Sequence, residues 1–383
     1  MQYGTRGDDC VLRTSARNSV KIDALGFPRF VIAVLIVVHH FYKGPFGSHF
    51  DWAFSGVNLF FILSGFVVTL SKVSKEWPPQ GTLRILPVPQ TLLRRVATNY
   101  PVYLAAVMSS FFLDVCKGSR PHWWQIGAEV TLTSTWLPRV FRPEGRYYNV
   151  PLWFVSALAC FWMLEEATFA LVALFWRSGC PLLASGLFFV TWMAATPFSL
   201  GFRWLSTADL WWYMADTPLQ YYPQYLSGVM LAFVWRHRVA SGAPASTWLA
   251  SATAAAFVGL FFIDPGGLCS SPWCVEHWLK RYGVLSPLFC LHVLGLAEGS
   301  DPLAQAFTMH PLPWLGELAY AFYAFQGPTV WLLVKFCPGF DSSNSGAKVM
   351  IILACLLPIA IVVQRYIQDP AGRWISHLAK HLA

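Results

Sequence analysis

The stretch PRFVIAVLIVVHHFY, residues 28–42, decides the fold class of this chain. It is an almost unbroken apolar run with an arginine near its start and two histidines near its end. A membrane core about 30 Å thick needs roughly 20 such residues in a helix. A second run, GVNLFFILSGFVV at 56–68, follows closely, with asparagine and serine as its polar side chains. The pair predicts two neighbouring membrane-spanning helices.

The whole chain has the same apolar character. Of its 383 residues, 56% are hydrophobic and only 12% are charged, whereas a soluble globular chain carries about 25% charged residues. The 19 Trp, 14 Tyr and 30 Phe are typical of a protein with many membrane–water crossings, where amphipathic aromatic rings collect. The composition excludes a disordered chain and argues against a water-soluble enzyme.

The charges and cysteines exclude further classes. The net charge is +8, from 27 Lys and Arg against 19 Asp and Glu. These cations lie in short loops and form no stripe or tail, so we expect anionic lipid headgroups or a phosphate-bearing substrate as partners, and no nucleic acid. The nine cysteines form no zinc-like pair of CxxC motifs, so we expect no metal. Cys269 and Cys274 could form a local disulfide, and two free thiols explain them equally well.

Apolar runs of suitable length recur along the sequence, and they predict an all-α, polytopic membrane helical bundle of about ten transmembrane helices. We expect a polar cytoplasmic segment at 1–22, a transmembrane domain at 23–372 and a short tail at 373–383. The loop cations favour cytoplasmic N- and C-termini. The expected spans are 27–43, 54–72, 95–114, 151–170, 180–198, 219–235, 246–263, 283–297, 314–336 and 347–367.

Arg29 and His40 are the first candidates for chemistry, because ionisable residues inside a span cost several kcal/mol unless paired or hydrated. They are eleven positions apart, which places them on one helix face about 16 Å apart along the axis. A ligand with a charged head and a long arm could touch both. From these two residues alone, an ordinary cytoplasmic flank and a histidine bonded between helices are an equally good interpretation.

Polar residues of the next spans add weaker candidates. Asn58 needs buried partners and could orient an imidazole, whereas Ser64 beside a glycine serves helix packing by default. Arg94 and Arg95 begin the third span, where the helix dipole favours anions. An anionic ligand would offset that cost, and anchoring by the positive-inside rule is the alternative.

Two adjacent acids, Glu165 and Glu166, lie about twelve residues into the fourth span. Either they face a cavity and bind an acceptor, or the span ends before them. The cost of burying two charges favours an earlier end of the span.

Motifs in a fixed order along the chain resemble the acyltransferase 3 family, from about residue 22 to residue 372. The members of that family are multispan membrane enzymes that move acyl groups from acyl-CoA onto carbohydrate or other acceptors. The motifs are DALGFPRF with VVHHF, GVNLFFILSGF, RRVATNYPVYL, PLWFVSAL, PQYLSGVMLA and LGELAYAFYAFQGPTV.

The resemblance implies roles residue by residue. The family's first-span Arg and the His eleven residues later match Arg29 and His40. It implies acyl-CoA, with acetyl-CoA foremost, as co-substrate and no metal. His40 would be the general base with Asn58 near it, and Arg29, Arg94 and Arg95 would hold the CoA phosphates.

The same resemblance implies substrate contacts and also shows departures. A further Arg of the family is Thr98 here, a frequent His is Gln326, and a common Glu is Gln368. These changes indicate a divergent branch. The residues that would contact substrate are Ser64, Trp153, Tyr323 and Gln326.

We therefore expect an integral membrane acyltransferase that moves a short acyl group to a hydroxyl or amine of a carbohydrate, lipid or small-molecule acceptor. Two other classes stay open. A transporter would line its path with intramembrane polar residues, although the chain shows no pair of related halves. A catalytically silent scaffold or accessory subunit of a membrane complex would tolerate departures such as Thr98 and Gln326.

Overall fold

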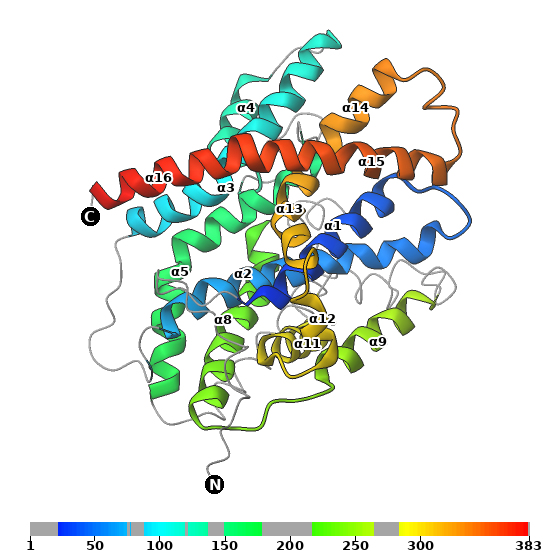
Figure 1. Ribbon diagram of the computed structural model, residues 1–383. Coiled ribbons are helices and arrows are strands. Elements are labelled where there is room, and N and C mark those ends of the chain that lie inside the picture. Colours follow the sequence, from blue (N-terminus) through cyan, green and yellow to red (C-terminus); the bar gives the residue numbers. More distant parts are fainter. Residues whose placement is uncertain are drawn as a thin grey trace, which may run out of the picture.

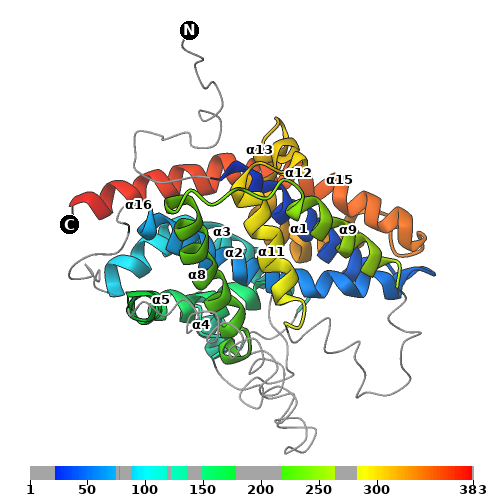
Figure 2. The same cartoon turned by 90° about the horizontal axis from the view of Figure 1, so that it is seen from below.

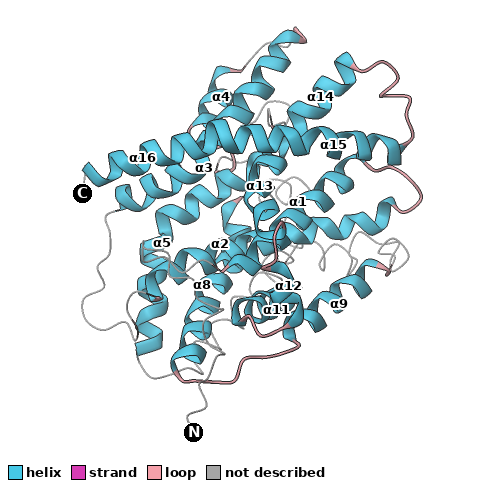
Figure 3. Ribbon diagram, viewed as in Figure 1, coloured by secondary structure: helices cyan, strands magenta, loops and turns pink. Residues whose placement is uncertain are grey.

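A computed structural model describes residues 22–74, 77, 88–118, 122–136, 149–177, 217–263 and 283–381. Every regular element in these ranges is a helix (Figure 3). The all-α prediction is confirmed for this part of the chain. The predicted span at 180–198 and the two cysteines at 269 and 274 lie outside the described residues.

Five described segments are long and apolar enough to cross a membrane, so a membrane helical bundle is supported but a total of ten spans is not. They contain α1 (Gly26–Phe41), α2 (Gly56–Val73), most of α3 (Val88–Cys116), α5 (Trp153–Arg177) and α15 (Ser345–Val363). The segments are Asp23–Phe41, Gly47–Val73, Arg95–Cys116, Trp153–Arg177 and Ser345–Ile375.

Three other predicted spans have helices that do not meet this standard. α9 (Leu249–Phe261) and α11 (Ser286–Glu298) have 13 residues each, which makes them about 20 Å long, shorter than a hydrocarbon core. α8 (Pro218–Ala240) is long enough, but it begins with PLQYYPQY and ends in a basic turn.

The predicted span at 314–336 is wrong as a single helix. The structure has α13 (Leu312–Ala324) and α14 (Gln326–Phe336), with Phe325 between them. Pro328 has no N–H to donate, and it is tolerated in the first turn of a helix, where N–H groups have no intrahelical partner. The break therefore places Gln326 at the first position of α14, inside the bundle.

Glycines bring two helix pairs into backbone contact. A Cβ on Gly65 of α2 would collide with the carbonyl of Tyr225 in α8, and one on Gly228 would collide with the carbonyl of Ile62. A Cβ on Gly316 of α13 would likewise collide with the backbone of Gly26 in α1. Small residues allow such close packing between membrane helices. The second contact holds α1 and α13 together, and both helices contribute to the site below.

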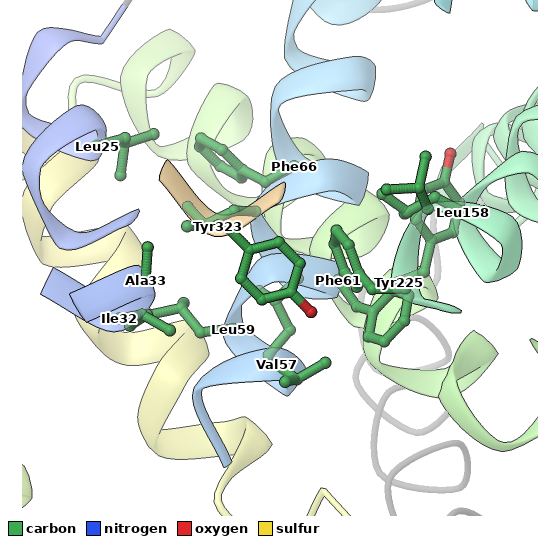
Figure 4. Packing of buried hydrophobic residues seen from close by; sticks show 14 of the residues in the cluster. Leu25, Ile32, Ala33, Val57, Leu59, Phe61, Phe66, Leu158, Tyr225 and Tyr323 are labelled. Carbon is green, nitrogen blue, oxygen red and sulfur yellow. The ribbon is translucent and has the colours of Figure 1, made fainter. Parts of the chain in front are cut away.

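The remaining elements surround this centre. α15, the π-helical turn η6 (Gln364–Gln368) and α16 (Asp369–His381) form one long rod along a side of the bundle (Figures 1 and 2). Tyr323 lies among buried side chains of α1, α2, α5 and α8 (Figure 4). The short elements are η1 (Asp23–Leu25), η2 (Gly47–Ser55), α4 (Trp123–Val130), η5 (Val150–Leu152) and α12 (Pro302–Phe307).

Candidate active site

His40 lies in the last turn of α1 and contacts the helix break between α13 and α14. Its Nδ1 is 2.9 Å from Oε1 of Gln326. The Gln326 amide is fully buried, and its Nε2 donates to the carbonyl oxygen of Tyr323 at 2.9 Å. An amide oxygen can only accept, so in the neutral imidazole Nδ1 carries the proton and Nε2 has a free lone pair. This bond fixes the orientation of the His40 ring.

A cavity of about 380 Å³ surrounds the His40–Gln326 pair, and we call it the His40 cavity. It lies where the C-terminal ends of α1 and α3 meet the start of α14. At its wall, Nζ of Lys117 lies 3.4 Å from the Asp114 carboxylate and 5.6 Å from the centre of the Trp331 ring. The other lining residues are Phe41, Ser110, Leu113, Asn149, Pro151, Gly327 and Pro328.

A second cavity, of about 470 Å³, contains Arg29, and we call it the Arg29 cavity. The Arg29 guanidinium has no hydrogen bond or ion pair with any residue that the structure describes. An unpaired cation at membrane depth costs several kcal/mol, although the acids Glu317 and Asp369 also line this cavity. Residues from seven elements line it, and they include Ser64, Arg95, Thr98, Asn99, Glu317, Tyr323, Gln364, Gln368 and Asp369.

Arg95 differs from Arg29 because acids of α5 already neutralise it. Its Nε and Nη2 donate to the two carboxylate oxygens of Glu165 at 3.1 Å each. Lys72 of α2 lies 3.1 Å from Glu165 and 2.8 Å from Glu166. Both acids are in the middle of α5 and buried, so the expectation that the span ends before them is wrong. Lys72 of α2 and Arg95 of α3 compensate these two negative charges.

The predicted site residues fall into two groups and a remainder. Arg29, Arg95, Ser64 and Tyr323 line the Arg29 cavity, whereas His40 and Gln326 line the other. The structure describes the backbone but not the side chain of Arg94.

Two further predicted residues line neither cavity. Asn58 is buried, and neither atom of its amide has a hydrogen-bond partner among the described residues. The Trp153 ring packs against Tyr221, with ring centres 5.0 Å apart. Roles for both in the reaction stay predictions.

Tyr323 and Pro151 separate the two cavities. The Tyr323 hydroxyl donates to the carbonyl oxygen of Pro151 at 2.6 Å. Tyr323 lines the Arg29 cavity and Pro151 lines the His40 cavity. The rings of Phe60 and Phe154 pack around Tyr323, with centres 6.1 and 6.3 Å away. The place of Pro151 between the cavities was not predicted, although this residue begins the motif PLWFVSAL.

The helical bundle thus has apolar helices long enough to cross a membrane, an arginine in a cavity at one end of α1 and a histidine in a cavity at the other. The family model described as an acyltransferase domain matches residues 22–380. The chain therefore belongs to the acyltransferase 3 family, as its motifs predict.

One curated relative is the peptidoglycan O-acetyltransferase OatA of Listeria monocytogenes, which is 25% identical over 341 residues. The match covers 84% of this chain and 50% of the relative, so the chain spans about half the length of that protein. No solved structure matches the chain.

Proposed function

We propose that this protein moves a short acyl group, acetyl foremost, from acyl-CoA to a hydroxyl or amine of a carbohydrate, lipid or small-molecule acceptor. One observation carries the proposal. A single helix, α1, places an arginine in one cavity and a histidine in the next, and neither the guanidinium nor the imidazole Nε2 has a partner among the described residues. The first suits a phosphate-bearing donor, and the second suits a nucleophile that must lose a proton.

In the proposed reaction His40 is the general base. Its Nε2 takes the proton of the acceptor hydroxyl or amine as that oxygen or nitrogen attacks the thioester carbonyl. The new C–O or C–N bond forms, the C–S bond breaks, and the thiolate leaves and takes up a proton. Such general-base catalysis contributes typically about 10²–10⁴-fold. Gln326 orients the imidazole, a role that Asn58 lacks the contact to perform.

The donor would be held at the Arg29 cavity. Arginine binds phosphate through charge-assisted, often bidentate hydrogen bonds, and Arg29 has its whole guanidinium available. Arg95 has a weaker part, since Glu165 takes two of its donors, and Arg94 completes the proposed basic set. Because Arg29 and His40 are about 16 Å apart along α1, the thioester must arrive on a long arm that passes the contact between Tyr323 and Pro151.

The test is acetyl-CoA turnover by the purified protein in nanodiscs, followed as release of CoA thiol with and without cell-extract acceptors. Thiol release that requires an extract fraction and disappears in His40→Ala is expected. His39→Ala is the matched control, because His39 neighbours His40 but pairs with Asp51 at 3.0 Å and lines neither cavity. Equal turnover in wild type and His40→Ala would refute the catalytic assignment. Uptake of a solute into liposomes without acyl-CoA would favour a transporter.

A further inference from the structure

Glu165 of α5 holds the guanidinium of Arg95 from behind the wall of the Arg29 cavity. Nε and Nη2 of Arg95 donate to its two carboxylate oxygens at 3.1 Å each. Arg95 lines the cavity, and 27% of its side chain is exposed. Glu165 does not line the cavity, and only 3% of its side chain is exposed. A ligand in the cavity can therefore reach Arg95 but not the acid that holds it.

The other end of the same guanidinium stays open. Glu165 occupies the edge formed by Nε and Nη2, and no residue that the structure describes accepts a hydrogen bond from Nη1. The end formed by Nη1 and Nη2 has the fork geometry that fits a carboxylate or a phosphate through parallel N–H donors. Arg95 thus has one edge fixed by the protein and another available for an anion.

Lys72 of α2 balances the charge of the second acid, Glu166. Two carboxylates buried on neighbouring residues need compensation, because an uncompensated buried charge is strongly destabilising. Nζ of Lys72 lies 2.8 Å from Glu166, 3.1 Å from Glu165 and 5.1 Å from the centre of the Phe169 ring. Lys72 is therefore held between the two acids, while both oxygens of Glu165 bond Arg95.

The burial of Glu165 decides between two roles that it could have. An acid that competes with a ligand for Arg95 lowers the affinity for anions, whereas an acid that fixes the guanidinium raises it. Competition requires access to the same N–H groups, and Glu165 covers the edge away from the open one. The acids that do line the cavity, Glu317 and Asp369, are exposed, where water and salt screen their charge. The contact therefore favours a role in fixing Arg95.

We propose that Glu165 is a positioning residue for donor binding. It holds Arg95 in the orientation in which the free end of the guanidinium binds a phosphate group of the donor in the Arg29 cavity. Without Glu165, a long side chain would have to be ordered each time a ligand binds, at a cost in rotamer entropy. The inference rests on the proposed function for the identity of the donor, but binding of inorganic pyrophosphate tests it without any acyl transfer.

The binding test measures the Kd of labelled CoA and of labelled inorganic pyrophosphate by equilibrium dialysis against the protein in nanodiscs. Glu165→Asp keeps the negative charge but shortens the side chain, so it withdraws the carboxylate from Arg95. We expect the Kd of both probes to rise about fivefold, as the entropy of ordering one long side chain predicts. Glu166→Asp is the matched control, because Glu166 is also buried and pairs with Lys72, and it should leave both Kd values unchanged.

A double variant tests whether Glu165 acts through Arg95. Arg95→Ala alone should raise the Kd of CoA about 10-fold, since it removes hydrogen bonds to a charged group. Adding Glu165→Asp to Arg95→Ala should raise it no further. A further loss would mean that Glu165 supports the fold or acts elsewhere, and it would overturn the proposal. An unchanged or lower Kd in Glu165→Asp alone would also overturn it, because the acid would then only neutralise Arg95.

Acetyl-CoA turnover separates this inference from the proposed reaction. The KM for acetyl-CoA should rise about fivefold in Glu165→Asp, whereas kcat should stay unchanged, because His40 lies in the other cavity. The expected shift in Kd without any turnover by the wild type would support the role of Glu165 and refute the acyl-CoA reaction. Turnover with the same KM in wild type and Glu165→Asp would refute the positioning role alone.

Discussion

The two cavities are similar in size but contain different ionisable groups of α1, Arg29 in one and His40 in the other. They measure about 470 and 380 Å³, and α1 contributes to both. The Arg29 cavity has an unpaired guanidinium, whereas the His40 cavity has an imidazole already oriented by a buried amide. The comparison shows that the two ends of one helix can face cavities of different chemistry. Arg29 at one end can bind an anionic group, and His40 at the other can accept a proton.

A hydrogen bond joins a residue that lines one cavity to a residue that lines the other. One hydrogen bond, from Tyr323 to Pro151, joins α13 to the turn before α5. A ligand long enough to touch both ends must displace side chains at this point. The following predictions run from the largest expected effect to the smallest, and two of them ask whether a change in one cavity alters the other.

The largest expected effect belongs to the base. His40→Ala should lower kcat by about 10²–10⁴-fold, while the Kd of acetyl-CoA stays within about twofold of wild type. Steady-state thiol release gives kcat, and equilibrium dialysis with labelled acetyl-CoA gives Kd. A large loss of CoA binding in this variant would show that the two cavities are not separate in function.

The next effect concerns stability around the Arg29 cavity. Glu165→Gln leaves Lys72 and Arg95 short of one buried negative charge, and breaking a buried ion pair costs about 3–5 kcal/mol. We expect a clear drop in Tm in detergent. Asp114→Asn is the control, because its pair with Lys117 is largely exposed and worth about 0–1 kcal/mol. Equal Tm values for the two variants would contradict the structure of this cluster.

Binding of the donor should depend on the unpaired cation. Arg29→Ala should raise the Kd of CoA about 10-fold to 100-fold, because hydrogen bonds to charged groups contribute about 1.5–3 kcal/mol. Arg29→Lys should recover part of this loss, since it restores the charge but not the planar guanidinium. The measurement is the same dialysis experiment, and reactivity of His40 toward diethyl pyrocarbonate should not change. An unaltered Kd in Arg29→Ala would leave the cavity without its proposed ligand.

The smallest effect is expected at the wall. Tyr323→Phe removes the hydroxyl that bonds Pro151, which costs about 1 kcal/mol of stability. With this contact weakened, the arm and water should pass more easily, so acetyl-CoA hydrolysis without acceptor should rise a few-fold. Thiol release in the absence of extract measures it. A fall in hydrolysis would indicate that the hydroxyl assists the reaction instead of closing the path.

Much of the fold follows from local sequence, and some of it does not. The apolar runs of α1, α2, α3, α5 and α15 predict their helices, because burial in lipid depends on length and hydropathy alone. The same reasoning failed at 314–336, where the hydropathy is continuous but the backbone breaks at Phe325. The sequence Gln326-Gly327-Pro328 directly after Phe325 is a local signal for the break. A hydropathy average does not register it, because it takes no account of glycine and proline as helix breakers.

The sequence by itself determined the class of molecule and the separation of Arg29 from His40, since composition sets solubility and helical geometry sets spacing within one helix. Only the tertiary structure decided the partners. Glu165 neutralises Arg95, and Gln326 orients His40. These contacts join residues 70 or more positions apart, as the 286 positions between His40 and Gln326 illustrate. No local pattern records them, because they form only when separate helices meet.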